Sequence, residues 1–410
     1  MTPAPPPTAG APTHDARTAR RDLAILLTGT GVSTVGGSLS LLAVMVHLEP
    51  SGAAWVAAAL GAELVPIALL APVVGRLVDR VSNRPLLVAA TLLQGVAVLL
   101  AAVVGLGPGR EGVVVGALVL LGVGTALSNP VIAALLPRVT GEERATRAYG
   151  WFSMISQTGF LVGFAVAGLL VEATSVRTAL LVDAASYGVL AVAVLAVRTH
   201  RRPERAAGAD DGGLWLGFAR LRTDRVLLLG VGGLAAATLV SVVVNVADVF
   251  YVLGDVGAGP GAYGVVTALW PAAGVLGGWA AGRLVGQQAL FRALAGAVVL
   301  MGVGLLVTGS VVSIVAVGIG WVLGGAANAA QRVALNALVR ARTADAERGR
   351  VFAAVSGGLQ VANLVGLAIG AGVVAAIGAR ASLLVSGAVT VAVGAALLVA
   401  GRARVVDPAS

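Results

Sequence analysis

The chain has 410 residues, of which 58% are hydrophobic and 11% are charged, and its formal net charge is +9. Soluble domains are nearer a quarter charged, so these side chains are too few to cover a water-exposed surface, and lipid is the expected solvent. The sequence contains no Cys and no Lys, which excludes disulfides, thiolate-bound metals and the phosphate-binding loop of ATP-driven pumps. Its three His are too scattered for a metal site, and no nucleophile–base constellation is found. We therefore expect no catalytic site, no metal and no cofactor.

A start rich in Pro, Ala and Thr over residues 1–19 has the composition of a disordered tail. Twelve apolar segments follow, each close to the length of about 20 residues that crosses a bilayer as a helix. We place them at 23–48, 54–78, 85–107, 112–137, 147–171, 177–197, 226–252, 261–286, 290–311, 312–338, 349–376 and 380–401. No charge marks the junction of the ninth and tenth spans near Ser310. The sequence predicts an all-α membrane protein with twelve transmembrane helices.

The longest polar stretch lies at mid-chain, over about 198–225. It predicts a cytoplasmic linker between two six-helix halves, in which the segment from Leu214 to Leu221 forms a short interfacial helix. The expected divisions are a disordered tail over 1–21, an N-terminal bundle over 22–197, the linker over 198–225, a C-terminal bundle over 226–401 and a second tail over 402–410.

The distribution of Arg predicts the orientation. If the N-terminus is cytoplasmic, the outward loops hold only Arg110, Arg177 and Arg380 of the 28 basic residues. This is the positive-inside bias, and an even number of spans then puts both termini in the cytoplasm. Topology thus explains the net charge, so we expect a multi-pass protein of the cell membrane that binds no nucleic acid.

The two halves of the chain resemble each other. With a shift of about half the chain length, Arg147 aligns with Arg350 and Gln157 aligns with Gln360. A second match pairs residues 75–78 with residues 282–285. Two parallel six-helix repeats, related by pseudo-symmetry, are the architecture of transporters whose halves rock about a site at the membrane midplane.

The loop after span 2 runs from Gly75 to Pro85 and reads GRLVDRVSNRP. It resembles the signature loop of the major facilitator superfamily, in which Gly, Asp, Arg and later basic residues recur at fixed spacing. The residues that match are Gly75, Asp79, Arg80 and Arg84, whereas Ser82 and Asn83 replace a usual Gly and Arg. The resemblance implies that this loop latches the cytoplasmic side against the other half, with Asp79 near the inner end of span 11. An anion suits that role beside Arg or at a helix N-terminus.

Further segments make the chain similar to the drug-exporter branch of that superfamily, which includes macrolide-efflux and siderophore exporters. They are residues 36–40 (GGSLS) in span 1, residues 181–187 (LVDAASY) in span 6 and residues 348–352 (RGRVF) at the start of span 11. Span 5 also carries a degraded form of the antiporter motif, whose small residues suit either that motif or ordinary helix packing. A seam of small residues in span 8, at Gly274, Gly278 and Gly282, is assigned to packing.

Three acids lie within the spans, where an ionisable side chain is costly and so becomes a functional candidate. Glu63 falls near the midplane of span 2 and can exchange a proton or attract a cation, or it is a protonated acid bonded to a neighbouring helix. Asp248 lies in the outer third of span 7, either as a second proton carrier or in a solvated vestibule. Asp183 in span 6 is nearer the outer end, and a structural role is expected for it.

Neutral polar side chains supply candidates for a substrate cavity or for bonds between helices. They are Asn129, Gln157, Asn245, Asn328, Gln331 and Gln360. In the family that the chain resembles, spans 1, 4, 7 and 10 line the cavity, which favours Asn245 and Asn328.

Together these features predict a monomeric secondary transporter that exports amphiphilic small molecules through a largely apolar cavity by proton antiport. Its expected partners are the substrate, protons and the lipid bilayer. The alternatives are an importer of a sugar or other metabolite by proton symport, and a membrane receptor or scaffold without transport activity.

Overall fold

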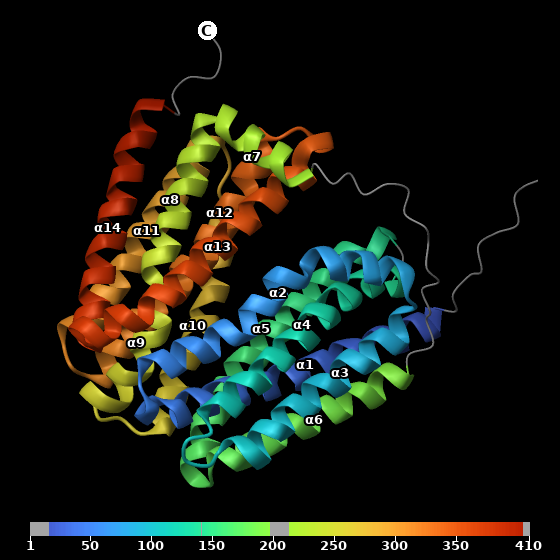
Figure 1. The fold of residues 1–410 in the computed structure, drawn as a ribbon. Coiled ribbons are helices and arrows are strands. Elements are labelled where there is room, and N and C mark those ends of the chain that lie inside the picture. Colours follow the sequence, from blue (N-terminus) through green and yellow to red (C-terminus); the bar gives the residue numbers. More distant parts are fainter. Residues whose placement is uncertain (1–15, 141, 197–212, 405–410) are drawn as a thin grey trace, which may run out of the picture.

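The computed structural model describes residues 16–140, 142–196 and 213–404, and within these ranges the chain is built of helices and short turns, without a strand. In the described part, twelve helical segments are long and apolar enough to cross a membrane (Figure 1). The prediction of an all-α protein with twelve spans is confirmed.

The first six spans pack mainly on one another and form the N-terminal bundle. They are α1 (Ala16–Leu48), α2 (Ala53–Arg80), α3 (Asn83–Leu100), α4 (Glu111–Thr140), α5 (Glu142–Ala173) and α6 (Val176–Ala196). A 3-10 turn at Glu49–Ser51 follows α1, and a π-helical turn at Ala101–Gly105 extends α3. Helix α1 packs along α5 and α6, while α4 packs along α2 and α3.

The short helix α7 (Gly213–Thr223) precedes the C-terminal bundle and contains the segment for which a short helix was predicted. The bundle itself consists of α8 (Arg225–Ser241), α9 (Val244–Phe250), α10 (Pro260–Ala281), α11 (Gln287–Ser310), α12 (Ile314–Arg342), α13 (Asp345–Ile377) and α14 (Ala379–Arg404). Helix α11 packs along α12 and α14, and α10 packs along α12.

The seventh span is broken, although the sequence predicts one continuous helix. Helix α8 ends at Ser241, α9 restarts at Val244, and a π-helical turn at Tyr251–Asp255 completes the span. Helix α13 packs against this break, because a Cβ placed on its Gly370 would lie 3.3 Å from the Cα of Val243. Irregular backbone at membrane depth is tolerated where protein covers it.

The turn between α11 and α12 confirms the predicted junction near Ser310. The guanidinium of Arg380, in the first turn of α14, donates to the carbonyl oxygens of Gly309 at 2.9 Å and Ser310 at 3.0 Å. These carbonyls close α11 and have no partner within their own helix. Arg380 therefore supplies the cap that the uncharged junction lacks.

The two bundles share one hydrophobic core at only one end of the molecule. We call the end with α7 and the last turn of α12 the arginine-rich end, and the other the opposite end. At the opposite end, one cluster of buried side chains includes Leu42 and Val56 of the first bundle with Val246 and Tyr251 of the second. Toward the arginine-rich end, each bundle has its own separate cluster. Figure 1 accordingly shows two bundles that meet at one end and diverge toward the other.

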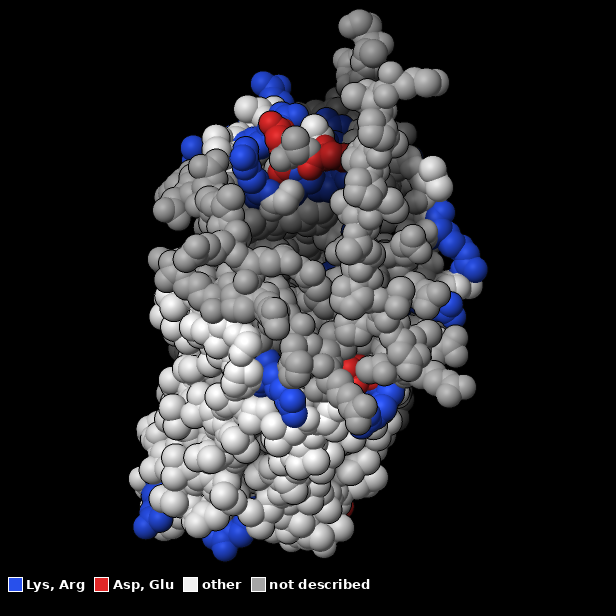
Figure 2. Space-filling model, turned by 90° about the vertical axis from the view of Figure 1, so that its right-hand side faces the viewer, with Lys and Arg blue, Asp and Glu red and all other residues white. Residues whose placement is uncertain are grey.

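The distribution of charge on the surface also distinguishes the arginine-rich end from the rest of the molecule. In Figure 2, basic side chains surround a small acidic group at the end that carries α7, and the visible surface below is mostly uncharged. Large apolar side chains are exposed along the spans, and Leu69 (72% exposed) and Val192 (68% exposed) are examples. An uncharged, apolar belt of this kind suits contact with lipid.

Small residues set the closest helix contacts. In α5, Gly159 and Gly163 pack on α1, where Cβ atoms in their place would lie 2.9 Å from Thr34 and 2.6 Å from Ser38. In α10, the tightest contact falls on Gly277, where a Cβ would lie 2.0 Å from the carbonyl oxygen of Ala326. Gly277 lies outside the seam that the sequence suggested for this span, but Gly274 and Gly278 of that seam also face α12 at ordinary van der Waals distance.

Candidate functional site

The two bundles contact each other mainly through α5 with α10 and α2 with α13. Helices α5 and α10 cross with their backbones in direct contact. A Cβ on Gly168 would lie 2.3 Å from the carbonyl oxygen of Pro260, and one on Gly264 would lie 2.7 Å from the Cα of Gly168. Only glycine fits at this crossing, which lies toward the opposite end.

Glu63 lies on the face of α2 that packs against α4. A Cβ on Gly122 of α4 would lie 2.4 Å from the backbone carbonyl oxygen of Glu63, so the two helices touch here. The side chain is partly buried and has no hydrogen-bond or salt-bridge partner among the described residues. Its charge interacts with Asp183 and Tyr187 of α6. The candidate proton carrier is therefore close enough to a second acid for their charges to interact, and the sequence predicted a structural role for that acid.

Asp183 is completely buried between α1 and α6. Ser186 donates to its Oδ1 at 3.0 Å, and Ser40 donates a short hydrogen bond to its Oδ2. A Cβ on Gly36 would lie 2.2 Å from the same Oδ1, so glycine is required there. Two segments that carry the resemblance to drug exporters, 36–40 and 181–187, are thus in contact and form one polar cluster inside the bundle.

Asp248 is held inside the C-terminal bundle. Its Oδ2 accepts a hydrogen bond from the Tyr263 hydroxyl of α10 at 3.2 Å, and its Oδ1 accepts from the backbone N–H of Val249 at 2.7 Å. Tyr263 is buried, whereas Asp248 is partly buried. The acid can therefore bind a proton while a neighbouring hydroxyl fixes its orientation.

The neutral polar side chains proposed for a substrate cavity differ in how far they are buried. Asn129 and Asn245 are exposed; Gln157, Asn328 and Gln360 are partly buried; and Gln331 is 5% exposed. Gln157 points across the bundle interface, because its Nε2 lies 3.9 Å from where a Cβ of Gly274 in α10 would be. The Nε2 of Gln331 is buried without a hydrogen-bond partner in the described structure.

An aromatic pair in the C-terminal bundle was not singled out from the sequence. The rings of Trp270 and Trp321 meet edge to face with their centroids 5.6 Å apart. Gly324 and Gly325 of α12 make room for Trp270, since a Cβ on either would lie within 2.5 Å of it. The indole N–H of Trp321 is buried without a hydrogen-bond partner in the described structure.

The signature loop is described only in part. Gly75, Asp79 and Arg80 belong to the last turns of α2, but their side chains lie outside the described set, as does the proposed latch contact of Asp79. The Arg84 guanidinium donates a short hydrogen bond to the carbonyl oxygen of Leu195, which joins the start of α3 to the end of α6.

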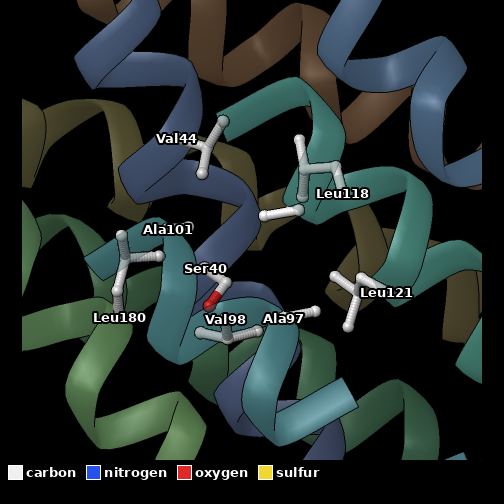
Figure 3. Close-up of a pocket in the computed structure, with 9 residues that line it drawn as sticks. Ser40, Val44, Ala97, Val98, Ala101, Leu118, Leu121 and Leu180 are labelled. Carbon is white, nitrogen blue, oxygen red and sulfur yellow. The ribbon is translucent and has the colours of Figure 1, made fainter. Parts of the chain in front are cut away.

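A small cavity lies inside the N-terminal bundle and is lined by apolar side chains with the Ser40 hydroxyl (Figure 3). Its volume is about 10 Å³, which is near the minimum for one water molecule. It is too small for an organic substrate.

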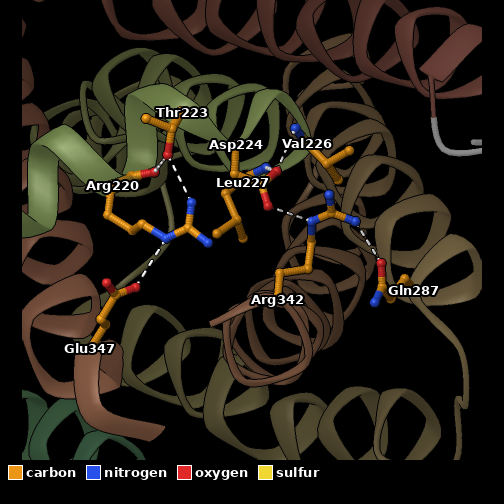
Figure 4. A network of polar contacts seen from close by, with 8 residues as sticks. All are labelled: Arg220, Thr223, Asp224, Val226, Leu227, Gln287, Arg342 and Glu347. Atoms are coloured by element: carbon orange, nitrogen blue, oxygen red, sulfur yellow. Dashed lines mark hydrogen bonds and ion pairs between the residues drawn. The ribbon is translucent and has the colours of Figure 1, made fainter. Parts of the chain in front are cut away.

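A polar network fixes the arginine-rich end of the C-terminal bundle (Figure 4). Asp224 accepts from Arg342 of α12 at 2.7 Å, and Arg342 also donates to Gln287 of α11 at 2.5 Å. Arg220 of α7 pairs with Glu347 of α13 at 3.0 Å. A groove of about 220 Å³ runs along the contact between α7 and α13, and Arg220 and Glu347 both line it. The linker helix is thereby tied to the bundle that follows it.

Comparison with known families matches the Major Facilitator Superfamily model to residues 22–322. The chain belongs to the Major Facilitator Superfamily. This is the superfamily of membrane transporters that the sequence resembles, and the resemblance to its drug-exporter branch is supported as well.

Macrolide efflux protein A of Streptococcus pyogenes is 27% identical over 216 residues, which cover 50% of this chain and 53% of that protein. Multidrug resistance protein 1 of Bacillus subtilis is 29% identical over 203 residues, which cover 48% of this chain and 50% of that protein. The chain thus spans about half the length of these curated relatives.

Solved structures show the same fold at low identity. The nucleoside transporter NupG superposes with a TM-score of 0.74 at 12% identity, covering 92% of this chain and 98% of that one. A bacterial homologue of the human lysosomal transporter Spinster gives 0.71 at 14% identity, covering 97% and 100%.

Proposed function

We propose that this transporter exports amphiphilic small molecules in exchange for protons, and that the bundles over 22–197 and 226–401 rock against each other to alternate access. The division of the hydrophobic core supports this cycle, because a core shared at one end and split at the other is what one end-point of such a motion requires. The relatives named for efflux and multidrug resistance support the direction of transport.

The uneven distribution of Arg between the two ends of the molecule supports a cytoplasmic location for the arginine-rich end and for both termini. Basic residues concentrate on the cytoplasmic side of membrane proteins. The conformation described is then inward-facing, closed at the outer surface. Figure 1 is consistent with this state, because the bundles diverge toward the end that carries α7. The Spinster homologue is described as inward-facing and unoccupied as well.

Glu63 is the proposed proton carrier. The observation that carries the proposal is that Glu63 has no cationic partner among the described residues, while its charge interacts with that of a second acid, Asp183. Two carboxyl groups whose charges interact in a low-dielectric site do not both ionise readily, which favours a proton on one of them. Movement of α2 against α6 would change that interaction and the proton affinity with it. Asp248, hydrogen-bonded to Tyr263, is the second candidate carrier.

The test is efflux of a cationic amphiphilic dye from proteoliposomes under an imposed pH gradient. Glu63→Gln keeps the size and hydrogen bonding of the side chain but cannot exchange a proton. We expect proton-driven efflux to fall by about 100-fold, the lower end of what a positioned proton-transfer group contributes in enzymes. Efflux that responds fully to the gradient in this variant would move the carrier role to Asp248.

Glu111→Gln is the matched control, because Glu111 is a carboxylate at the opposite end that bonds Ser51 of its own bundle at 3.0 Å. It should leave the gradient response unchanged. Uptake of a sugar or nucleoside with protons, in place of dye efflux, would favour the symporter alternative. A protein that moves neither would favour a receptor or scaffold.

A further inference from the structure

At the opposite end, an acid of one bundle reaches the first turn of a helix in the other. Glu172 lies in the last turn of α5, and its Oε2 accepts a hydrogen bond from the backbone N–H of Gly261 in α10 at 2.6 Å. The fit is close, because a Cβ on Gly261 would lie 2.1 Å from that oxygen and one on Gly259 would lie 3.3 Å from it. The site was not found from the sequence, in which Glu172 is an exposed acid at the end of a span.

Helix α10 cannot cap itself. Its N-cap residue is Gly259, which has no side chain, and its first residue is Pro260, which has no N–H to offer. Gly261 therefore presents the first unpaired donor of the helix, and the N-terminus carries partial positive charge. A carboxylate that accepts this donor makes a charge-assisted bond and complements the helix dipole.

The cap is supplied across the bundle interface. Glu172 is one turn beyond Gly168, whose backbone touches that of Gly264 in α10. The glycine crossing lets the two helices approach closely enough for the carboxylate to reach Gly261. If the bundles separate at this end, the bond must break and the first turn of α10 loses its cap.

We propose that Glu172 is a latch that holds the two bundles together at the opposite end and so stabilises the conformation in which that end is closed. The proposal rests on the alternating access of the proposed function, in which this end must open once in each cycle. Replacing the latch should shift the carrier toward the state that is open at the opposite end.

The test is a distance measurement with spin labels, for which the chain is suited because it contains no native Cys. One pair replaces the exposed residues Arg177 and Asp255 at the opposite end, and a second pair replaces the exposed Gly150 and Ala341 at the arginine-rich end. In Glu172→Ala, the population with the longer distance should rise about fivefold at the opposite end, which is the effect typical of losing a helix N-cap. The distance at the arginine-rich end should shorten in the same molecules.

Two variants separate a latch from a general loss of folding. Glu172→Gln can still accept the N–H of Gly261 without the charge, so it should restore much of the closed population. Gly261→Ala should open the end in the wild-type background, where the Cβ meets the carboxylate. It should add little in Glu172→Ala, because the next nearest atom, a Cδ of Leu169, lies 3.4 Å away.

Glu111→Ala is the matched control, since it removes a carboxylate at the same end that bonds only within its own bundle. Unchanged distances in Glu172→Ala, or an equal shift in Glu111→Ala, would overturn the latch even if dye efflux is normal. Loss of dye transport by the wild-type protein would instead refute the proposed function and leave the distance result standing.

Discussion

The Asp224 side chain both caps helix α8 and forms an ion pair with Arg342, so replacing it tests how the arginine-rich end is stabilised. Its Oδ1 accepts from the backbone N–H groups of Val226 at 2.9 Å and Leu227 at 3.1 Å, as the N-cap of α8. Its Oδ2 accepts from Arg342 at 2.7 Å. The side chains of Asp224 and Arg342 are 9% and 25% exposed, so water replaces the lost bonds poorly.

The two roles have separable magnitudes. Loss of an N-cap side chain costs about 1 kcal/mol, and removal of one partner of a hydrogen bond to a charged group costs about 2 kcal/mol. Asp224→Ala should therefore lower the free energy of unfolding by about 3 kcal/mol, the sum of the two. Asp224→Asn keeps the cap, since Asn is as good an N-cap as Asp, and should cost about 2 kcal/mol.

The assay is unfolding of the purified protein in mixed micelles with increasing SDS, followed by tryptophan fluorescence. Arg342→Gln should cost much less in the Asp224→Ala background than in the wild type, because its partner is already absent. Equal destabilisation by Asp224→Ala and Asp224→Asn would show that the cap contributes nothing. Additive effects of Asp224→Ala and Arg342→Gln would refute the coupling.

The same pair predicts a pH dependence. Burial alone would raise the pKa of the Asp224 carboxyl, but the hydrogen bonds from Arg342 and the Leu227 N–H outweigh it and hold the pKa below the ordinary value of 3.8. A depressed pKa contributes stability that is present above the unfolded value and lost as the pH falls through the folded value. The difference between wild type and Asp224→Asn should thus be constant at neutral pH and shrink below about pH 4.

Two further outcomes are expected. In the same SDS titration, Gly277→Val should lower the free energy of unfolding by about 3 kcal/mol, because overpacking costs roughly 1–3 kcal/mol and backbone atoms of Ala326 block the new side chain. The control Gly296→Ala should be neutral or stabilising, because the space around Gly296 is open. In intact cells, an impermeant maleimide should label Ser175→Cys and spare Ala341→Cys, and the reverse pattern would contradict the proposed orientation.

Much of the fold follows from the sequence for a simple physical reason. Each span must satisfy its backbone hydrogen bonds internally and bury about 20 apolar residues in lipid, so hydropathy alone reports where spans begin and end. The repeat, exemplified by Gln157 and Gln360, and the loop from Gly75 to Arg84 then identify the superfamily. Even the uncharged junction at Ser310 was predicted, because no longer helix fits the bilayer.

The candidate site was predicted only in outline. Glu63 and Asp248 were found as acids within spans, since such residues are rare at that depth. Their surroundings were not, because the Tyr263 hydroxyl reaches Asp248 only through the packing of α10 on the seventh span. Glu172 gave no signal at all, as its partner is the backbone N–H of a distant Gly261.

The physical reason is that lipid removes the contrast by which a soluble sequence marks its core. Leu42 is 2% exposed and Leu69 is 72% exposed, yet both are apolar, because one faces protein and the other faces lipid. Hydropathy therefore determined the spans and their number, and the distribution of Arg determined the expected orientation of this chain. Only tertiary structure decided which helix faces meet, where the shared core ends, and which acid accepts the first free N–H of α10.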